Sequence, residues 1–242
     1  MATAPGWLGD DRTAREERRI EAAYERRRGS ASRYSHLDPA HLYMVQERAR
    51  GLLGLLRSAG VETLQPAKVL DVGCGDGQLL TELIAWGARP EHLSGVDLLS
   101  ARIAEARARC PAGVRLETGS AAALPFDDAA FDIVVQATVF SSILDAEVRR
   151  RAAAEMLRVV KPTGLILWYD FFVDNPRTPD VRGVGRNEIR QLFPGCAVVL
   201  RRMSLAPPLA RAVAPRSPLL CRLLGAVPLL CTHYVGLIRR VA

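Results

Sequence analysis

Acidic residues are missing from the C-terminal part of the chain. From Cys196 to Ala242 there are seven Arg residues and no Asp or Glu, which gives this segment a charge of +7. The whole chain of 242 residues also has a formal net charge of +7, so the residues before Cys196 are balanced. A basic, apolar segment attracts an acidic substrate or an anionic membrane surface. The same charge also suits a solvated surface in a chain whose basic residues, apart from Lys68 and Lys161, are all Arg.

Paired cysteines and a secretory signal are also lacking. None of the five cysteines has the C-x-x-C spacing, and no cluster of Cys and His suggests a zinc site. The first residues lead into an Arg- and Glu-rich stretch instead of an apolar signal segment. We therefore expect reduced thiols, no bound metal and a cytoplasmic location.

No hydrophobic run is long enough to cross a bilayer. The longest uncharged stretch of the C-terminal segment, residues 223–238, has 16 residues, fewer than the roughly 20 that a spanning helix needs. It overlaps a Pro- and Leu-rich stretch at about 206–230, which we expect to be an apolar insertion packed against a sheet or over a pocket. The remaining composition, 49% hydrophobic and 24% charged, is that of a globular protein with a full core.

Apolar residues alternate between strand and helix patterns after two N-terminal helices. The first helix is expected at 12–29, and the second begins at Asp38-Pro39 and ends at Gly60. Strands are then predicted at 68–72, 93–98, 114–117, 131–137 and 165–171, with helices at 78–86, 100–109 (capped by Ser100) and 145–159, and final strands at 198–205 and 232–241. This alternation predicts an α/β fold with a parallel sheet and helices on both faces.

The segment VLDVGCGDGQLL, residues 69–80, points to a ligand site. A strand runs into Asp71, and Gly73, Gly75 and Gly77 follow at alternate positions before a helix. Glycines permit a tight turn and let a ligand approach the backbone, and the new helix points free N–H groups at that ligand. The dinucleotide fingerprint G-x-G-x-x-G is not met, because Gln78 stands where the third glycine belongs, and no Gly-Lys-Ser/Thr marks a P-loop.

This segment resembles the first motif of class I S-adenosylmethionine-dependent methyltransferases, in particular those called type 11. Gly95-Val96-Asp97 ends the second strand where the family places an acid on the ribose hydroxyls, and Leu98 would pack against the adenine. Gly119-Ser120-Ala121 and Leu124-Pro125-Phe126 resemble the segment beside the adenine, although many relatives carry Asp at the Ser120 position. The resemblance implies S-adenosylmethionine as cofactor and a Rossmann-like, seven-stranded, mostly parallel sheet with an antiparallel final strand. The implied cofactor-binding residues are Asp71, Gly73, Cys74, Gly75, Gly77, Asp97, Leu98, Ser120, Ala121 and Gln136.

Residues for the methyl acceptor are less clearly marked. Tyr169 and Asp170 close the fifth strand, and Asp170 is a candidate base or hydroxyl-binding group as well as a simple strand-end carboxylate. His36, His41 and His233 are candidate bases whose structural interpretation is favoured for each. Tyr24, Tyr34 and Tyr43 belong to the N-terminal helices, which often form a lid in this family; the alternative is that they anchor these helices.

The sequence thus predicts an N-terminal helical lid at 1–62 and a cofactor-binding domain at 63–242. The expected activity is methylation of a small molecule, with a hydroxyl of a sugar, natural product or lipid-linked metabolite favoured over nitrogen or carbon. A nucleic-acid substrate is not expected, because the chain has Gln136-Ala137-Thr138-Val139 after the fourth strand instead of Asn/Asp-Pro-Pro-aromatic. The alternatives are a non-catalytic protein of the same fold and a peripheral membrane protein that docks through residues 206–230.

Overall fold

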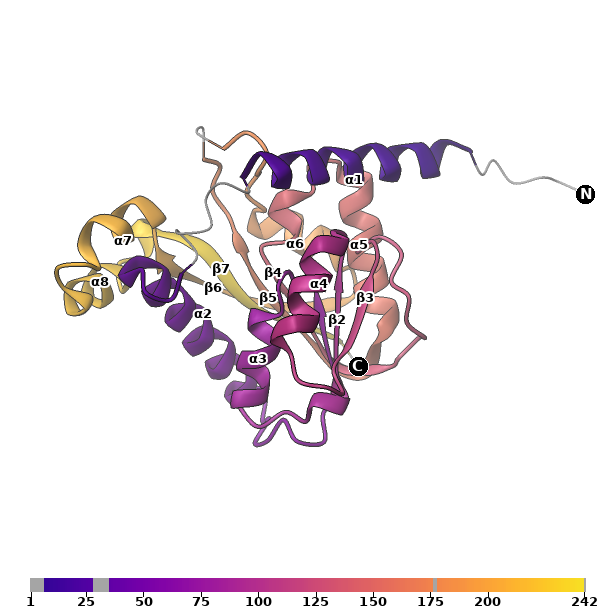
Figure 1. The fold of residues 1–242 in the computed structure, drawn as a ribbon, viewed down its shortest axis with the longest axis horizontal. Coiled ribbons are helices and arrows are strands. Elements are labelled where there is room, and N and C mark those ends of the chain that lie inside the picture. Colours follow the sequence, from indigo (N-terminus) through magenta and orange to yellow (C-terminus); the bar gives the residue numbers. More distant parts are fainter. Residues whose placement is uncertain (1–6, 28–34, 176–177, 242) are drawn as a thin grey trace, which may run out of the picture.

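The computed structural model describes residues 7–27, 35–175 and 178–241, with side chains from residue 11 onward. Seven strands form one sheet in the order β3-β2-β1-β4-β5-β7-β6 (Figure 1). The strands are β1 (Val69–Val72), β2 (Leu93–Asp97), β3 (Arg115–Thr118), β4 (Phe131–Ala137), β5 (Val160–Phe171), β6 (Cys196–Leu205) and β7 (Cys231–Arg240). β1 to β5 pair in parallel, whereas β7 runs antiparallel to both β5 and β6. The predicted fold class, with its antiparallel final strand, is confirmed.

Helices cover both faces of the sheet. The helices are α1 (Trp7–Arg27), α2 (Pro39–Ser58), α3 (Gln78–Ala85), α4 (Ser100–Arg109), α5 (Ala146–Val159), α6 (Arg186–Leu192), α7 (Pro207–Val213) and α8 (Pro218–Gly225), with short 3-10 turns η2 (Pro90–His92), η3 (Phe140–Ser142) and η4 (Pro228–Leu230). Successive residues of a strand point to opposite faces. In β4, Ile133 and Val135 pack with α2, α3 and α4, and Val134 packs with α5 and α6. Two cores therefore sandwich the sheet.

The predicted helices from α2 to α5 begin and end within two residues of their predicted bounds, whereas α1 begins at Trp7, five residues before its predicted start at residue 12. One predicted cap is also wrong. Asp38 caps α2 through hydrogen bonds from the backbone N–H groups of Ala40 and His41. The predicted serine cap of α4 is wrong, because Leu99 holds the N-cap position and Ser100 is the first helical residue. The Leu99 N–H instead donates to the Asp97 carboxylate at 2.9 Å. Among the described residues, no side chain caps α4, and Asp97 instead holds the backbone of its N-cap residue.

The two N-terminal helices have different surroundings. The second half of α2 is part of a core, since Leu52, Leu55 and Leu56 are buried against the sheet. α1 lies across the start of α5 (Figure 1), where Glu16 accepts a hydrogen bond from the Leu144 N–H. α1 thus lies beside the carboxyl end of β4. Residues 28–34, which connect the two helices and include Tyr34, lie outside the described residues.

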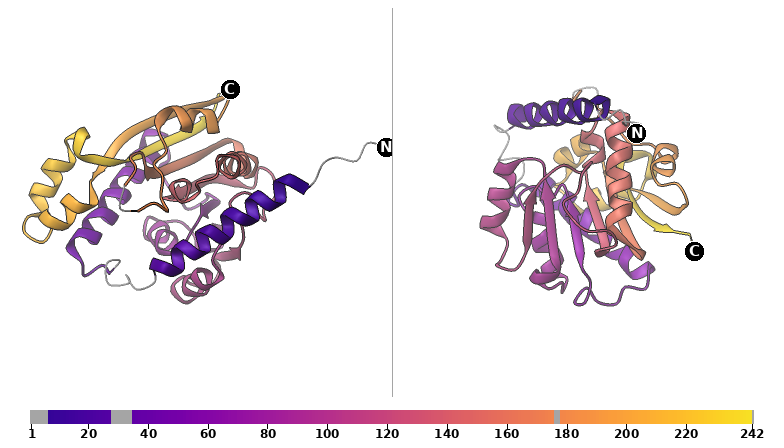
Figure 2. Two further views of the ribbon diagram at one scale, coloured as in Figure 1. Left: turned by 90° about the horizontal axis from the view of Figure 1, so that it is seen from above. Right: turned by 90° about the vertical axis from the view of Figure 1, so that its right-hand side faces the viewer.

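The stretch at 206–230 forms two short helices and a 3-10 turn between β6 and β7, and it projects from the rest of the molecule together with the start of α2 (Figure 2). A small third core joins it to α2; its buried members are Ala40, Tyr43, Leu205, Ala210, Ala214 and Cys221. The insertion therefore rests mainly on α2. Within the described part of the chain, no helix has both the length and the apolar character needed to cross a membrane.

Candidate cofactor and active site

The loop between β1 and α3 is built on three left-handed glycines. Gly73, Gly75 and Gly77 have φ values of 71°, 56° and 79°, a region that side chains disfavour. The loop is tied to β2, because the N–H groups of Gly73 and Cys74 both donate to the Val96 carbonyl at 2.8 and 3.0 Å. The sequence interpretation of these glycines as a tight turn is confirmed by these angles.

Two of these glycines are also required by close neighbours. A Cβ atom on Gly73 would lie 2.4 Å from Val139 Cγ2, and one on Gly77 would lie 2.7 Å from Cys110 Sγ. Gly77 is the N-cap of α3 and offers no capping side chain. The first N–H groups of α3 therefore remain available to a ligand at the carboxyl edge of the sheet.

Asp97 links this loop to the next strand. One carboxylate oxygen accepts from the Gly75 N–H and the other from the Leu99 N–H, both at 2.9 Å. Burial raises the pKa of Asp97, and the two backbone donors oppose that rise. A carboxylate oxygen has more than one lone pair, so each oxygen can accept a further hydrogen bond. Asp97 is thus a fixed acceptor pair at the end of β2.

A second buried carboxylate, Asp71, lies in the middle of the site at the end of β1. Its exposed fraction is 2%, and burial raises its pKa to about 8 while the charge of Arg48 opposes the rise. Desolvation disfavours the ionised form of such a group. A cationic group of a ligand bound beside Asp71 would favour its ionised form.

Arg48 of α2 and Glu82 of α3 form an ion pair of 2.8 Å near this site. Gln78 also donates to Glu82 at 3.0 Å. Arg48 Nε and Glu82 Oε2 are buried without a hydrogen-bond partner, and buried polar atoms usually have one. This pair was not predicted, because the two residues lie on different helices 34 positions apart and neither belongs to the glycine motif.

The remaining cofactor candidates lie at the same edge. Gln136, fully buried at the end of β4, pairs in register with Val72; its Oε1 accepts from the Val139 N–H at 3.1 Å, whereas its Nε2 has no partner. Leu98, Ser120 and Ala121 are half-buried. The Ser120 hydroxyl accepts from the Ala122 N–H at 3.2 Å and so stabilises its own turn. All ten candidates therefore lie at or beside the carboxyl ends of β1 to β4, and their binding of a cofactor stays a prediction.

Tyr169 and Asp170 lie on opposite faces of β5. Asp170 is fully buried, and its oxygens accept from the N–H groups of Ser141 and Phe171 at 3.1 and 2.8 Å; burial raises its pKa to about 6. The Tyr169 hydroxyl is 2.8 Å from the Ser204 hydroxyl, and its ring stacks on His233. Asp170 thus holds the turn after β4. The alternative that it is a simple strand-end carboxylate without a partner is wrong. Their catalytic roles stay predictions.

The candidate histidines and Cys74 differ in burial and in their position relative to the glycine loop. His233 is buried, which lowers its pKa to about 3, and burial also lowers the pKa of His41. The ring of His36 lies 3.4 Å from the Gln78 amide, next to the glycine loop. Burial raises the pKa of the Cys74 thiol, which leaves it protonated and unreactive at neutral pH. Of the three candidate histidines, His36 thus lies beside Gln78 at the candidate cofactor loop, and its ring packs edge-on against His41 at 5.5 Å.

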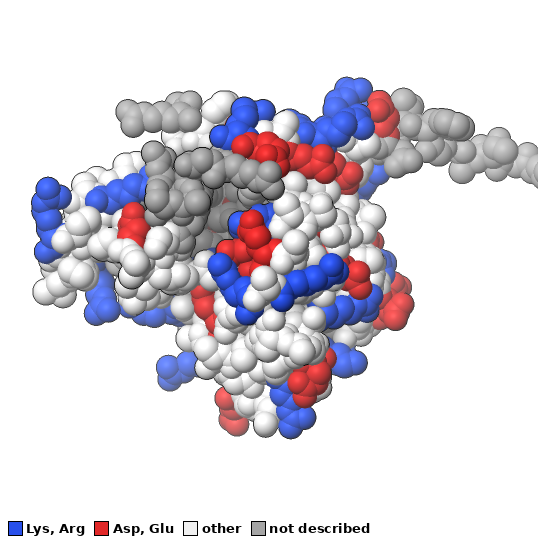
Figure 3. Space-filling model, in the orientation of Figure 1, with Lys and Arg blue, Asp and Glu red and all other residues white. Residues whose placement is uncertain are grey.

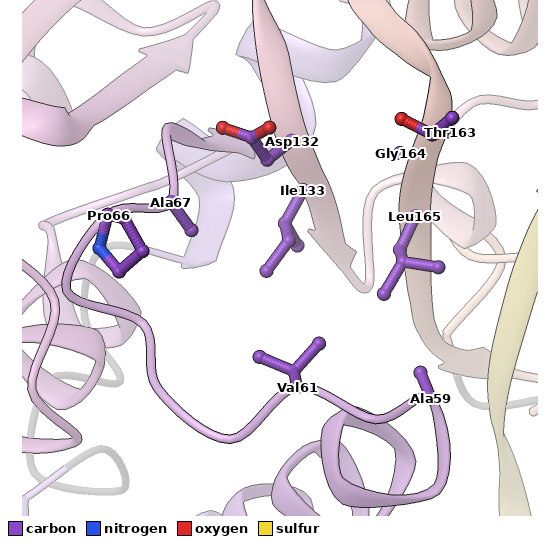
Figure 4. Close-up of a pocket in the computed structure, with 9 residues that line it drawn as sticks. All are labelled: Ala59, Val61, Pro66, Ala67, Asp132, Ile133, Thr163, Gly164 and Leu165. Carbon is purple, nitrogen blue, oxygen red and sulfur yellow. The ribbon is translucent and has the colours of Figure 1, made fainter.

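A surface hollow of about 330 Å³ lies at the other end of the sheet (Figure 4). It is lined by residues that precede β1, begin β4 and begin β5, including Asp132, whose carboxylate is 2.6 Å from Lys161 Nζ. Ligands of open α/β sheets bind outside the carboxyl ends of the strands. This hollow is therefore separate from the candidate site. No group of three or more His, Cys, Asp or Glu side chains arranged to bind a metal occurs among the described residues.

Residues 69–164 match a family described as "Methyltransferase domain". The chain contains a class I S-adenosylmethionine-dependent methyltransferase domain. It is 34% identical over 123 residues to a demethylmenaquinone methyltransferase of Deinococcus radiodurans (49% of each chain) and 32% identical over 130 residues to an O-methyltransferase of Penicillium expansum (50% of this chain, 45% of that one). It spans about half the length of the curated relatives that it matches.

Solved structures share the fold of this methyltransferase domain. An S-adenosylmethionine-dependent methyltransferase of Thermotoga maritima, described as a possible histamine N-methyltransferase, superposes with a TM-score of 0.61 at 16% identity and covers 91% of this chain and 99% of its own. A putative methyltransferase of Haloferax volcanii, solved with its Trm112 activator, gives 0.56 at 18% identity and covers 93% and 98%. At such identities the likeness concerns the fold alone.

The residues present fit S-adenosylmethionine, the cofactor of the methyltransferase domain. The first N–H groups of α3 follow the glycine loop without a capping side chain, and Asp97 has acceptor capacity for two ribose hydroxyls. The buried unpartnered Nε2 of Gln136 and Nε of Arg48 are donors suited to a carboxylate. The assignment of these residues to S-adenosylmethionine therefore rests on which of their atoms can donate or accept hydrogen bonds.

Proposed function

We propose that the protein transfers the methyl group of S-adenosylmethionine to a small molecule, with a hydroxyl of a sugar, natural product or lipid-linked metabolite as acceptor. The observation that supports it most is the coupling of Asp97 to the Gly75 N–H at the carboxyl edge, within the segment that matches the methyltransferase domain. Several relatives are named for small acceptors, such as demethylmenaquinone and malonyl-[acyl-carrier protein]. Intact glycines and Asp97 argue against a non-catalytic protein.

In this proposal the cofactor supplies an electrophilic methyl group, and the chain supplies orientation. Asp97 and the first N–H groups of α3 fix the nucleoside part, because both are held by the glycine loop. Arg48 and Gln136 hold the amino-acid part through their unpartnered donors. Fixing two reactants in line provides much of the rate of such a displacement.

The lid and the acceptor groups are further parts of the proposal. We propose that α1 and α2, the described helices of the predicted lid, cover the site; in support, Glu16 accepts from the Leu144 N–H and Arg19 donates to the Ser142 carbonyl after β4. Asp170 accepts a hydrogen bond from the Ser141 N–H and so positions the same turn. In this proposal the turn then positions the acceptor. A base that removes a hydroxyl proton must lie within hydrogen-bond reach of it or be joined to it by one water. Both Asp170 oxygens instead accept from backbone N–H groups, which favours a positioning role.

A product assay tests this proposal. The protein is incubated with methyl-labelled S-adenosylmethionine and separate panels of hydroxyl, amine and nucleic-acid acceptors, and labelled product and S-adenosylhomocysteine are measured. The proposal expects label in hydroxyl acceptors and none in nucleic acid. Labelled amines with unlabelled hydroxyls would overturn the choice of acceptor, and a folded protein that binds no cofactor would overturn the activity.

A further inference from the structure

The insertion between β6 and β7 exposes an unusual number of large apolar side chains. We call residues 206–230 the outer lobe. Exposed large apolar residues within it are Leu209 (38%), Leu219 (66%), Leu220 (44%), Leu223 (61%), Val227 (42%) and Leu229 (85%). Leu219, Leu220 and Leu223 lie at helical spacing on the outward side of α8, opposite the buried Cys221. Contiguous apolar surface of this kind marks an interaction site.

The inward side of the outer lobe is already satisfied by the rest of the protein. Ala210, Ala214 and Cys221 are buried against Ala40 and Tyr43 of α2. The Tyr43 hydroxyl donates to the Cys221 carbonyl at 3.0 Å. The exposed leucines are therefore not a poorly packed core; they remain outside after the lobe has docked on α2.

The charged residues of the outer lobe itself are all basic, and Asp38 at the start of α2 interacts electrostatically with one of them, Arg211. Arg211, Arg216 and Arg222 are exposed, and none of them forms an ion pair with a described residue. The outer lobe contains no Asp or Glu. Glu47 of α2 lies near it and is paired with Arg50. Figure 3 shows the left of the molecule, where the lobe projects beside the start of α2, as mostly white surface with blue groups at its margin and a red group within it. Leucine flanked by arginine suits a surface with an apolar interior and anionic headgroups.

The outer lobe lies at the same edge of the sheet as the candidate active site. It follows the carboxyl end of β6 and precedes the start of β7, and β7 is antiparallel to the parallel strands. That places it at the edge where β1, β2 and β4 end. α2 connects the two places, since Tyr43 binds the lobe and Arg48 binds α3 next to the glycine loop.

We propose that the outer lobe docks the protein on a membrane surface that contains anionic phospholipids, with the leucines in the interface and the arginines at the headgroups. Docking there turns the carboxyl edge of the sheet toward the lipid. A lipid-soluble acceptor then reaches the site from the bilayer; this last step, unlike docking, rests on the proposed function.

Vesicle sedimentation with the full-length protein tests the docking. The vesicles are phosphatidylcholine alone or phosphatidylcholine with 30% phosphatidylglycerol (about one anionic lipid in three). We expect tight binding to the anionic vesicles, weakened roughly 100-fold by R211Q/R216Q/R222Q and at least about tenfold by L219S/L223S/L229S. Added salt weakens the wild type and has little effect on the arginine variant.

Matched variants elsewhere on the surface serve as controls. R57Q/R190Q removes exposed arginines, and V199S removes an apolar side chain that is 61% exposed on β6. Both are expected to sediment like the wild type, and thermal melting checks the folding of every variant. Equal sedimentation of the wild type and the lobe variants overturns the proposal. So does a wild-type dimer in light scattering that the leucine variant alone makes monomeric, since the lobe then binds a second copy. No outcome of this assay depends on methyl transfer.

Discussion

The replacement of Asp97 by Asn tests the cofactor site most directly. In the structure, the two Asp97 oxygens accept from Gly75 and Leu99, and the proposed ribose hydroxyls take the remaining lone pairs. Asn keeps the shape but has one acceptor oxygen, and its NH₂ group faces an N–H donor. A hydrogen bond to a charged group contributes about 1.5 to 3 kcal/mol. The loss of one such bond to the cofactor raises its Kd roughly 10- to 150-fold.

Calorimetric titration of S-adenosylmethionine measures this change. Asp127→Asn is the matched control, because Asp127 is an exposed acid outside the candidate site, and its Kd is expected to equal that of the wild type. Thermal melting of the apo proteins is measured beside it, since Asp97→Asn also loosens the Gly75 loop.

The result that refutes this reasoning is a folded Asp97→Asn protein whose Kd lies within about twofold of the wild-type value, a free-energy change too small for a lost charged hydrogen bond. It would remove Asp97 from the cofactor site, although its structural bonds would stand.

Three further predictions concern buried groups. Burial raises the pKa of Asp71 from 3.8 to about 8, so between these pH values the folded state binds more protons than the unfolded state. The free energy of unfolding therefore falls as pH rises from about 4 to 8. Asp71→Asn flattens this fall in denaturation experiments, and equal pH dependence of the free energy of unfolding in the variant and the wild type would refute the prediction. Tyr43→Phe removes the hydrogen bond to Cys221 and lowers the free energy of unfolding by about 1 kcal/mol; no change would show that the bond contributes nothing. Asp170→Asn lowers the free energy of unfolding by about 1 to 3 kcal/mol through the Ser141 turn, yet leaves the pH profile of kcat/KM unchanged; loss of a limb near pH 6, the pKa of Asp170, would make it the base.

Three buried aspartates of the site are in an environment that disfavours their ionised form. Asp71, Asp97 and Asp170 all have raised pKa values, and burial is the largest cause each time. Such clusters of destabilised ionisable groups are typical of functional sites, where a ligand supplies the missing partners. Cofactor binding is therefore expected to stabilise the protein as well as to place the methyl group.

Local features of this protein were determined by the sequence alone. The strands, the caps at Asp38 and Asp145, and the left-handed Gly73, Gly75 and Gly77 follow from side-chain period and backbone freedom over a few residues. The ten candidate cofactor residues could be expected to lie together, because parallel strands bring their carboxyl ends to one edge. The family resemblance supplied the antiparallel final strand.

Only the tertiary structure decided which distant residues meet. The ion pair of Arg48 with Glu82 joins two helices, Glu16 reaches Leu144 across 128 positions, and Tyr43 attaches the outer lobe to α2. The complete burial of Asp170 depends likewise on the turn that packs over it. These contacts leave no periodic trace, because each depends on how whole elements pack and not on the residues beside it in the chain.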